Sequence, residues 1–227
     1  MGETDPPPPV RNPVRLIGDF MIDTKPARLS IFPLTGAILF PGMQLPLHIF
    51  EPRYRALVGD ALVRDRRIAM IQPQTRTDGA SLYQIGCVGK IGDVEASEDG
   101  RYNVVLTGEH RFRLLRELDV TTPFRQVEGE LLHDDTSEAL SSVERAGFER
   151  EARRFADAQG YSVDWESVSR LDDQSLINGV AQIAPFDPAA KQALLEAEDL
   201  AQRCELMVQL MYFFGRRDGE DDSITLQ

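Results

Sequence analysis

The sequence predicts an α+β protein in which a small antiparallel β-barrel or sandwich is followed by a helical bundle. Between residues 28 and 132, about six short segments alternate apolar and polar side chains, with close turns and a single helix among them. After Leu132, apolar residues recur at every third or fourth position, which is typical of helices. The net charge divides at nearly the same point, because residues 1–127 carry +1 and residues 128–227 carry −13.

The β-rich region contains one expected helix, which begins at Pro52 and continues to about residue 65. Glycines at positions 86, 89 and 92 interrupt one strand pattern and favour bulges or tight coiling, as at the bend of a barrel. Turns are expected at residues 98–100 and 108–110. The expected strands cover residues 28–34, 68–72, 83–94, 101–107, 111–118 and 124–132.

The second half is expected to contain helices over residues 138–159, 171–184 and 188–214. Thr136 or Ser137 is the expected cap of the first helix, and Gly160 its end. The expected organisation is an extended or disordered arm, a β-rich subdomain, a helical subdomain and a mobile acidic tail. Within the arm, residues 14–27 are apolar enough to dock on the main body. These four parts cover residues 1–27, 28–132, 133–214 and 215–227.

The segment from residue 40 to 54 reads FPGMQLPLHIFEPRY and combines three prolines and a glycine with many large apolar residues. Proline has no N–H group, so this segment is neither a regular helix nor a central strand. Its apolar side chains nevertheless favour burial, which predicts a packed segment of defined shape. The candidate residues for protein or peptide binding in this segment are Phe40, Met43, Leu45, His48, Phe50, Glu51, Arg53 and Tyr54.

Three groups of polar residues each allow a functional and a structural interpretation, and the structural one is favoured in each case. His48 is either a ligand-contacting or acid–base residue, or a hydrogen-bonded histidine at the edge of the core. Glu51 and Arg53 either anchor a peptide, or are a helix-start carboxylate and an exposed or paired arginine. Arg111 and Arg113 share one face of a strand and either contact an anion or acidic peptide, or are solvated or paired with the acidic helical half.

Known catalytic motifs are absent from the sequence: there is no GxxxxGK[ST], GxGxxG, HExxH or GxSxG, and no serine stands beside a histidine or lysine in a recognisable spacing. The three histidines are well separated, so neither a metal site nor a catalytic residue nor a cofactor is expected. Cys87 and Cys204 form no CxxC pair and are expected to be buried apolar residues, which fits a reducing, cytoplasmic environment. Neither a signal sequence nor an apolar segment of membrane-spanning length is found.

Residues 29–58, LSIFPLTGAILFPGMQLPLHIFEPRYRALV, closely resemble the start of the N-terminal, substrate-binding domain of Lon proteases. The similarity continues through IGCVGKI at residues 85–91, through DGRYNVVLTG at residues 99–108 with Arg-Phe-Arg at 111–113, and into the helical half. There it includes residues 173–186, KQALLE at 191–196, and Arg203. The resemblance covers residues 28–214 and implies a PUA-like β pseudo-barrel followed by a helical subdomain.

The resemblance, the absence of catalytic motifs and the apolar 40–54 segment together favour a non-catalytic module that recognises protein or peptide ligands in protein quality control. The groove between the two halves is the expected site. Neither an AAA+ module nor a Ser–Lys protease is present in the 227 residues, so the chain resembles stand-alone Lon-domain proteins. One alternative is a hydrolase with a site near His48. The other is an RNA-binding PUA-like protein, although the acidic charge disfavours nucleic acid. A membrane partner is not expected, and the sequence leaves the oligomeric state open.

Overall fold

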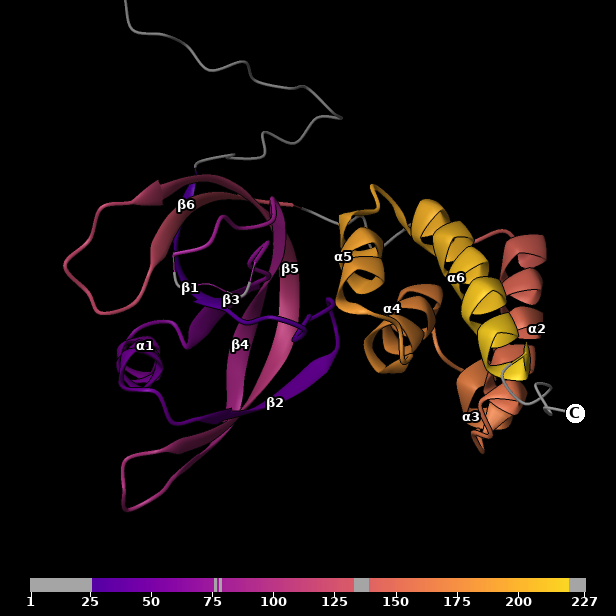
Figure 1. Cartoon of the computed structure of the whole chain (residues 1–227), viewed down its shortest axis with the longest axis horizontal. Helices are drawn as coiled ribbons and strands as arrows, with labels where there is room; N and C mark the ends of the chain where they lie inside the picture. The colour runs from indigo at the N-terminus through magenta and orange to yellow at the C-terminus, as the bar shows by residue number, and fades with distance from the viewer. Residues whose placement is uncertain (1–25, 76, 78, 133–138, 221–227) are drawn as a thin grey trace, which may run out of the picture.

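The computed structural model describes residues 26–75, 77, 79–132 and 139–220, and over these residues it confirms the α+β class. A β-rich part and a helical part lie side by side (Figure 1). The strands are β1 (Ala27–Pro33), β2 (Gln44–Ile49), β3 (Arg67–Ile71), β4 (Ile85–Ala96), β5 (Tyr102–Leu118) and β6 (Gln126–Leu131). The helices are α1 (Pro52–Val63), α2 (Ser142–Ala158), α3 (Trp165–Ser169), α4 (Asp173–Ile183), α5 (Pro188–Glu196) and α6 (Leu200–Glu220).

The described strands form one sheet that closes on itself. Their order is β2-β5-β4-β3-β1-β6, and an additional pairing of β5 with β6 closes all but β2 into a barrel. The expected antiparallel arrangement is wrong at one pair, because β1 and β3 run parallel. Parallel strands need a long connection between them. Here β2 and α1 supply it, and α1 packs its buried residues Leu57 and Val58 into the barrel core.

Strand β5 is continuous, so the turn expected at residues 108–110 is wrong. Its pairing with β4 skips one residue there: Val88 lies opposite His110, and Gly89 lies opposite Gly108. The extra residue is a β-bulge, which bends a strand without ending it. The bulges expected from the glycines of β4 are confirmed, at this position and again between Ile91 and Val94.

Strand β2 lies at the edge of the sheet and contains Pro46, which confirms that the segment is not a central strand. The N–H of Gly108 in β5 donates to the carbonyl of Met43 at 2.9 Å. By the alternation of antiparallel pairing, odd-numbered residues of β2 bond to β5, and even-numbered residues direct their backbone groups to the open edge. Pro46 is even-numbered, so its backbone nitrogen faces the open edge. The absence of an N–H on this nitrogen therefore removes no hydrogen bond within the sheet.

The helical part differs from expectation in four places. The first helix begins at Ser142 and not at residue 138, because the Ser141 hydroxyl caps it by accepting from the Glu144 N–H at 3.2 Å. The helix expected at 188–214 is two helices, because the backbone at Ala197 is not helical (φ −51°, ψ 132°). The second helix begins after Asp199, whose carboxylate accepts from the Gln202 N–H at 2.7 Å. The short α3 was not expected. Helix α6 continues to Glu220, beyond the expected start of the tail at residue 215. The expected caps at 136 and 137 are wrong, because Ser141 is the cap of α2. The arm at residues 1–25 and His133 lie outside the described residues.

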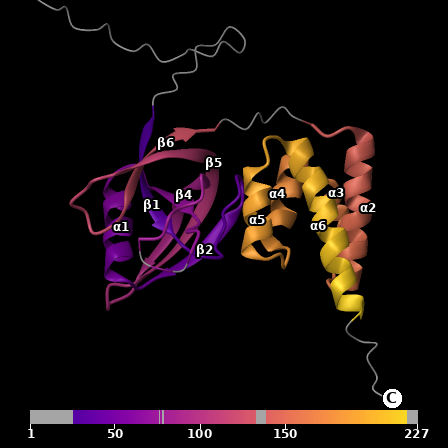
Figure 2. The same cartoon turned by 45° about the horizontal axis from the view of Figure 1, so that its top comes forward.

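Helices α4 and α5 face the barrel, while α2 and α6 lie on the far side (Figures 1 and 2). The two parts share one hydrophobic cluster, in which Ile38, Phe40 and Ile85 of the β-rich part pack with buried residues of the helices. The same boundary is also polar: Gln192 of α5 donates to the carbonyl of Ile85 at 3.0 Å. The helical part is thus packed against the barrel by apolar contacts and by buried hydrogen bonds. No described helix combines the length and the apolar character needed to cross a bilayer.

Candidate functional site: an apolar groove beside helix α4

An apolar groove of about 660 Å³, called the α4 groove below, opens in the helical part. None of its lining side chains is charged. It is bounded by the C-terminal half of α2, the following loop, α3, α4, and the residues just before and at the start of β2. Its lining residues are Met43, Gln44, Ala152, Phe155, Ala156, Tyr161, Ser162, Val163, Trp165, Val168, Leu171, Ser175, Leu176, Gly179, Val180, Gln182, Ile183, Ala184 and Met211.

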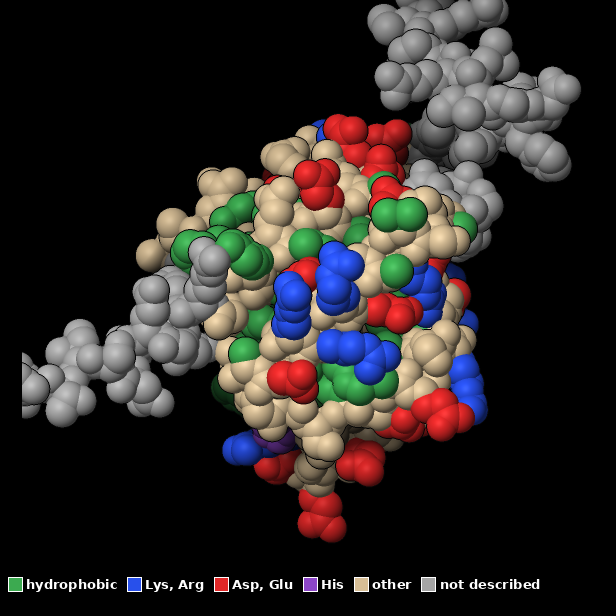
Figure 3. Space-filling model, turned by 90° about the vertical axis from the view of Figure 1, so that its right-hand side faces the viewer, with side chains coloured by type: hydrophobic (Ala, Val, Ile, Leu, Met, Phe, Trp, Pro, Cys, Tyr) green, Lys and Arg blue, Asp and Glu red, His purple; other side chains and the backbone are tan. Residues whose placement is uncertain are grey.

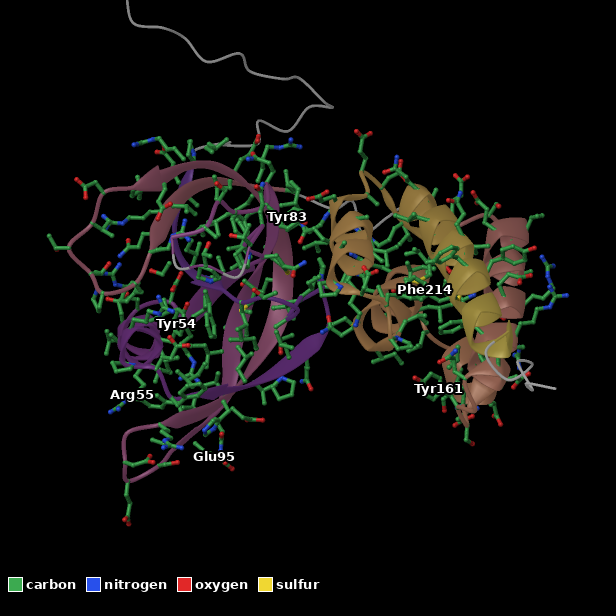
Figure 4. The ribbon with its side chains drawn as sticks, in the orientation of Figure 1. Tyr54, Arg55, Tyr83, Glu95, Tyr161 and Phe214 are labelled. Atoms are coloured by element: carbon green, nitrogen blue, oxygen red, sulfur yellow. The ribbon has the colours of Figure 1, made fainter. Side chains whose placement is uncertain are left out.

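Helix α4 contributes one apolar stripe to this groove. Leu176, Val180 and Ile183 recur at helical spacing, and their exposure rises along the stripe from buried Leu176 to Ile183, which is 79% exposed. Tyr161 and Leu171 are also exposed at the groove, and Figure 4 shows Tyr161 at the lower end of the helical part. An apolar surface of this kind, concave and open to solvent, is typical of sites that bind apolar ligands.

The wall that carries Met43 is held in place by two amide side chains one turn apart on α4. Asn178 Nδ2 donates to the carbonyl of Pro41 at 3.0 Å. Gln182 accepts from the N–H of Phe40 at 3.2 Å and donates to the carbonyl of Ile38 at 2.9 Å. These bonds replace the regular pairing that the proline-containing backbone does not make, so the groove is preformed.

Helix α4 itself is fixed at both ends. The carboxylate of Asp172 accepts from the Ser175 N–H at 2.8 Å, and this carboxyl has a lowered pKa, chiefly because the Ser175 hydroxyl also donates to it. At the other end, Lys191 Nζ donates to the carbonyl of Gln182 at 2.7 Å. Burial lowers the pKa of Lys191.

Of the eight candidate residues in the 40–54 segment, only Met43 lines the α4 groove. Phe40 has no exposed surface and belongs to the core shared by the two parts. Leu45 packs against the barrel core. Tyr54 is buried, with its ring centroid 4.1 Å from that of Phe32. In this structure all three residues build the fold: Phe40 and Tyr54 are buried, and Leu45 is partly buried.

The remaining candidates lie at the other end of the segment, on the barrel. His48 Nδ1 lies 2.7 Å from Asn103 Oδ1, and its ring centroid is 6.1 Å from that of exposed Phe50. Glu51 and Arg53 pair at 3.0 Å. His48 lines a separate hollow of about 480 Å³ that includes Glu95, and Figure 4 shows Glu95 and Tyr161 on different parts of the molecule. The structure therefore does not bring the whole segment into one site.

The two candidate arginines of β5 have different surroundings. Arg111 is 4% exposed and donates to the carbonyls of Leu195 at 2.8 Å, of Glu198 at 3.1 Å, and of Ala197. These acceptors belong to the C-terminal end of α5 and the loop after it, where a cation is favoured by the helix dipole. Arg113, two residues further along the strand, is exposed. Arg111 thus joins the barrel to the helical part through the backbone carbonyls of Leu195, Ala197 and Glu198.

Apart from Met43, the residues that line the groove were not among the sequence candidates. Leu176, Val180 and Ile183 repeat at a spacing that fits a buried helix face equally well, and only tertiary structure shows that no described helix covers it. Trp165 belongs to the unexpected helix α3, and the guanidinium of Arg153 lies 4.4 Å from its ring. The one local signal available was an isoleucine at the helix end, at position 183, directly before the Ala-Pro pair at 184–185.

Both cysteines are buried. Burial raises the pKa of Cys204 to about 11, so this thiol stays protonated at neutral pH and is a poor nucleophile. The hydrogen-bond partner of His48 is an amide, which offers no nucleophile for that imidazole to activate. Within the described residues, no group of three or more His, Cys, Asp or Glu side chains is placed to hold a metal ion.

Solved structures with the same architecture identify the class of fold as the N-terminal domain of Lon proteases. A Lon N-terminal domain protein from Xanthomonas campestris superposes with a TM-score of 0.63 at 22% identity, covering 82% of this chain and 98% of that one. The N-terminal domain of the Mycobacterium avium complex Lon protease gives a TM-score of 0.65 at 19% identity, with the same coverages of 82% and 98%.

The chain belongs to the family of the substrate-binding domain of ATP-dependent protease La (LON), whose model matches residues 28–212. Among curated relatives, Lon protease 2 of Myxococcus xanthus is 29% identical over 82% of this chain. Lon protease 2 of Syntrophobacter fumaroxidans is 30% identical over 75% of it. The aligned regions make up 24% and 22% of those two relatives, so the chain spans about a quarter of their length.

Proposed function

We propose that this chain is a non-catalytic recognition module that binds apolar segments of other polypeptides in the α4 groove. The observation that carries the proposal is the groove itself, which is open, preformed, uncharged and flanked by exposed apolar side chains. Membership of a substrate-binding domain family supports it. We further propose that its ligands are substrates or partners in protein quality control and that it acts in the cytoplasm.

The surroundings of the groove also favour an apolar ligand over a strongly charged one. Arginine and acidic side chains are intermixed on the outer face of α2 and α6 (Figure 3), where Arg150 and Arg154 both pair with Glu151. Such a face has no single sign of charge with which to attract a nucleic acid or a polyacidic peptide. Within the groove, a charged ligand side chain would lose its hydration without gaining a partner of opposite charge.

Trp165 makes a direct binding assay possible, because it is the only tryptophan of the chain and lines the groove. The chain would be titrated with a tryptophan-free peptide of apolar and uncharged polar residues, and with a scrambled peptide in which half of the apolar positions are lysine or glutamate. The change in Trp165 emission would be followed. The apolar peptide should give a saturable change, and the charged peptide should give little.

Ile183→Asp places a charge at the rim of the groove, on an already exposed residue, and should leave the fold intact. Loss of one apolar contact and the added charge should weaken binding by about tenfold. Val63→Asp is the matched control, because Val63 is 83% exposed and is also the last residue of a helix. Equal effects of the two variants, or no saturable binding at any peptide concentration up to the millimolar range, would overturn the assignment of the groove.

Hydrolysis is tested separately, by mass spectrometry of the peptide after prolonged incubation with the chain, with and without ATP. We expect the peptide to remain intact. Turnover that His48→Ala abolishes would show instead that the barrel hollow around His48 is an active site.

A further inference from the structure

Methionine 43 differs from the other methionines that the structure describes. Met70, Met207 and Met211 are each at most 2% exposed. Met43 is partly exposed and lines the α4 groove. Its sulfur lies against α4, because a Cβ atom placed on Gly179 would be 3.7 Å from Met43 Sδ.

We propose that Met43 is a site of reversible oxidation, and that its sulfoxide weakens apolar ligand binding in the α4 groove. The binding consequence rests on the proposed function, whereas the preferential oxidation does not. The oxidant is a peroxide. The thioether sulfur attacks one oxygen of hydrogen peroxide, and an S–O bond forms as the O–O bond breaks. Sulfur loses two electrons, and the hydroxyl now on sulfur gives its proton to the leaving hydroxide, so the products are the sulfoxide and water.

Selectivity follows from accessibility. A peroxide molecule must reach the sulfur, and the three buried methionines are reached only after local opening of the core. The thiols compete poorly for the same reason, since Cys87 and Cys204 are buried and the Cys204 thiol stays protonated. Met43 should therefore be oxidised before any other sulfur of the described part of the chain.

The consequence follows from the chemistry of the groove. A sulfoxide is polar and a strong hydrogen-bond acceptor, whereas the lining is uncharged and largely apolar. Gln182, an amide that lines the groove, is already bonded to Ile38 and Phe40. A bound apolar segment would cover the sulfoxide and remove its water without providing a donor. A penalty of this kind should lower affinity by roughly tenfold.

The test treats the full chain with graded hydrogen peroxide and maps the mass increase of each methionine-containing peptide. Met43 should be oxidised at least about tenfold faster than Met70, Met207 and Met211. Equal or slower oxidation of Met43 would overturn the proposal. Met1 and Met21, outside the described residues, are mapped separately.

Binding of the apolar peptide is then measured before oxidation, after oxidation, and after treatment with methionine sulfoxide reductases. Met43→Leu, which keeps the volume and apolar character, should bind like the wild type and should lose no affinity on oxidation. The proposal is wrong if oxidised wild type binds as well as untreated protein, or if the leucine variant loses as much affinity as the wild type does.

Absence of peptide binding by untreated protein would contradict the proposed function alone. In that case the oxidation site is judged from the peptide map and from Trp165 emission, which should shift when Met43 is oxidised and should not shift in Met43→Leu. Unchanged Trp165 emission after complete oxidation of Met43 would show that the sulfoxide does not alter the groove.

Discussion

The contacts of Arg111 predict that Arg111→Met destabilises the chain while leaving the α4 groove unchanged. Methionine keeps most of the length of the side chain but removes every donor. The carbonyls of Leu195, Ala197 and Glu198 then lose a cationic partner in a buried position. At about 1 kcal/mol for each carbonyl, the loss is about 3 kcal/mol. Relief from desolvating the guanidinium offsets part of it, so the free energy of unfolding should fall by roughly 2–3 kcal/mol.

Urea denaturation followed by circular dichroism measures this change, and the thermal midpoint should fall by roughly 4–12 °C for a domain of this size. Arg113→Met is the matched control, since Arg113 is exposed on the same strand, and it should change the free energy of unfolding by no more than about 0.5 kcal/mol. Peptide affinity of folded Arg111→Met should equal that of the wild type. A loss below about 1 kcal/mol, or equal losses in the two variants, would refute the reasoning.

Three further predictions concern the groove wall, the bulge in β5 and the start of α4. Asn178→Ala removes the donor to Pro41 and the acceptor of Arg203 Nη1 at 2.9 Å, and should lower the free energy of unfolding by about 2–3 kcal/mol in urea titration. Gly108→Ala places a Cβ against the carbonyl of Phe40 and should lower the free energy of unfolding by at least about 2 kcal/mol. In the control Gly92→Ala, the new Cβ meets only ordinary contacts, and the loss should be less than about 1 kcal/mol. Equal losses would contradict the close packing at Gly108. Asp172→Ala should cost about 1 kcal/mol at pH 7. The pKa of Asp172 is lowered in the folded state, so the stabilisation from its carboxylate is present above the unfolded pKa of about 3.9. This stabilisation is lost as the pH falls through the folded pKa. Urea titrations of Asp172→Ala and wild type should therefore differ less at pH 3 than at pH 7.

Local pattern predicted those elements whose physical cause lies in neighbouring residues. Proline at position 52 marks the start of α1, and the expected strand at 28–34 differs from β1 by one residue at each end. The glycines of β4 indicated bulges because a residue without a side chain tolerates the close approach of another strand. The prolines of the 40–54 segment correctly excluded a central strand, although β2 itself was not among the expected strands.

Features that depend on distant contacts were missed. Gly108-Glu109-His110 has the composition of a turn, but pairing of β5 with β2, β4 and β6 keeps the strand continuous through it. Arg111 and Arg113 fall on the same face of the strand by its two-residue period, so the sequence does not distinguish their burial. Only the position of α5 buries Arg111 and leaves Arg113 exposed. The stripe at Leu176, Val180 and Ile183 gives no local sign of whether a neighbouring helix covers it. The composition of the 40–54 segment favoured it as a binding surface, and of its residues only Met43 and Gln44 line the groove.

Photo-crosslinking with an apolar peptide tests the binding claim most directly. A peptide carrying one photoreactive apolar residue would be irradiated with the chain, and the attached residues and the mass of the peptide would be determined. We predict attachment to α4, α3 and Met43, strong reduction of crosslinking in Ile183→Asp, and an uncleaved peptide. Crosslinks confined to the His48 hollow or to the outer face of α2 and α6, or a cleaved peptide, would contradict the account.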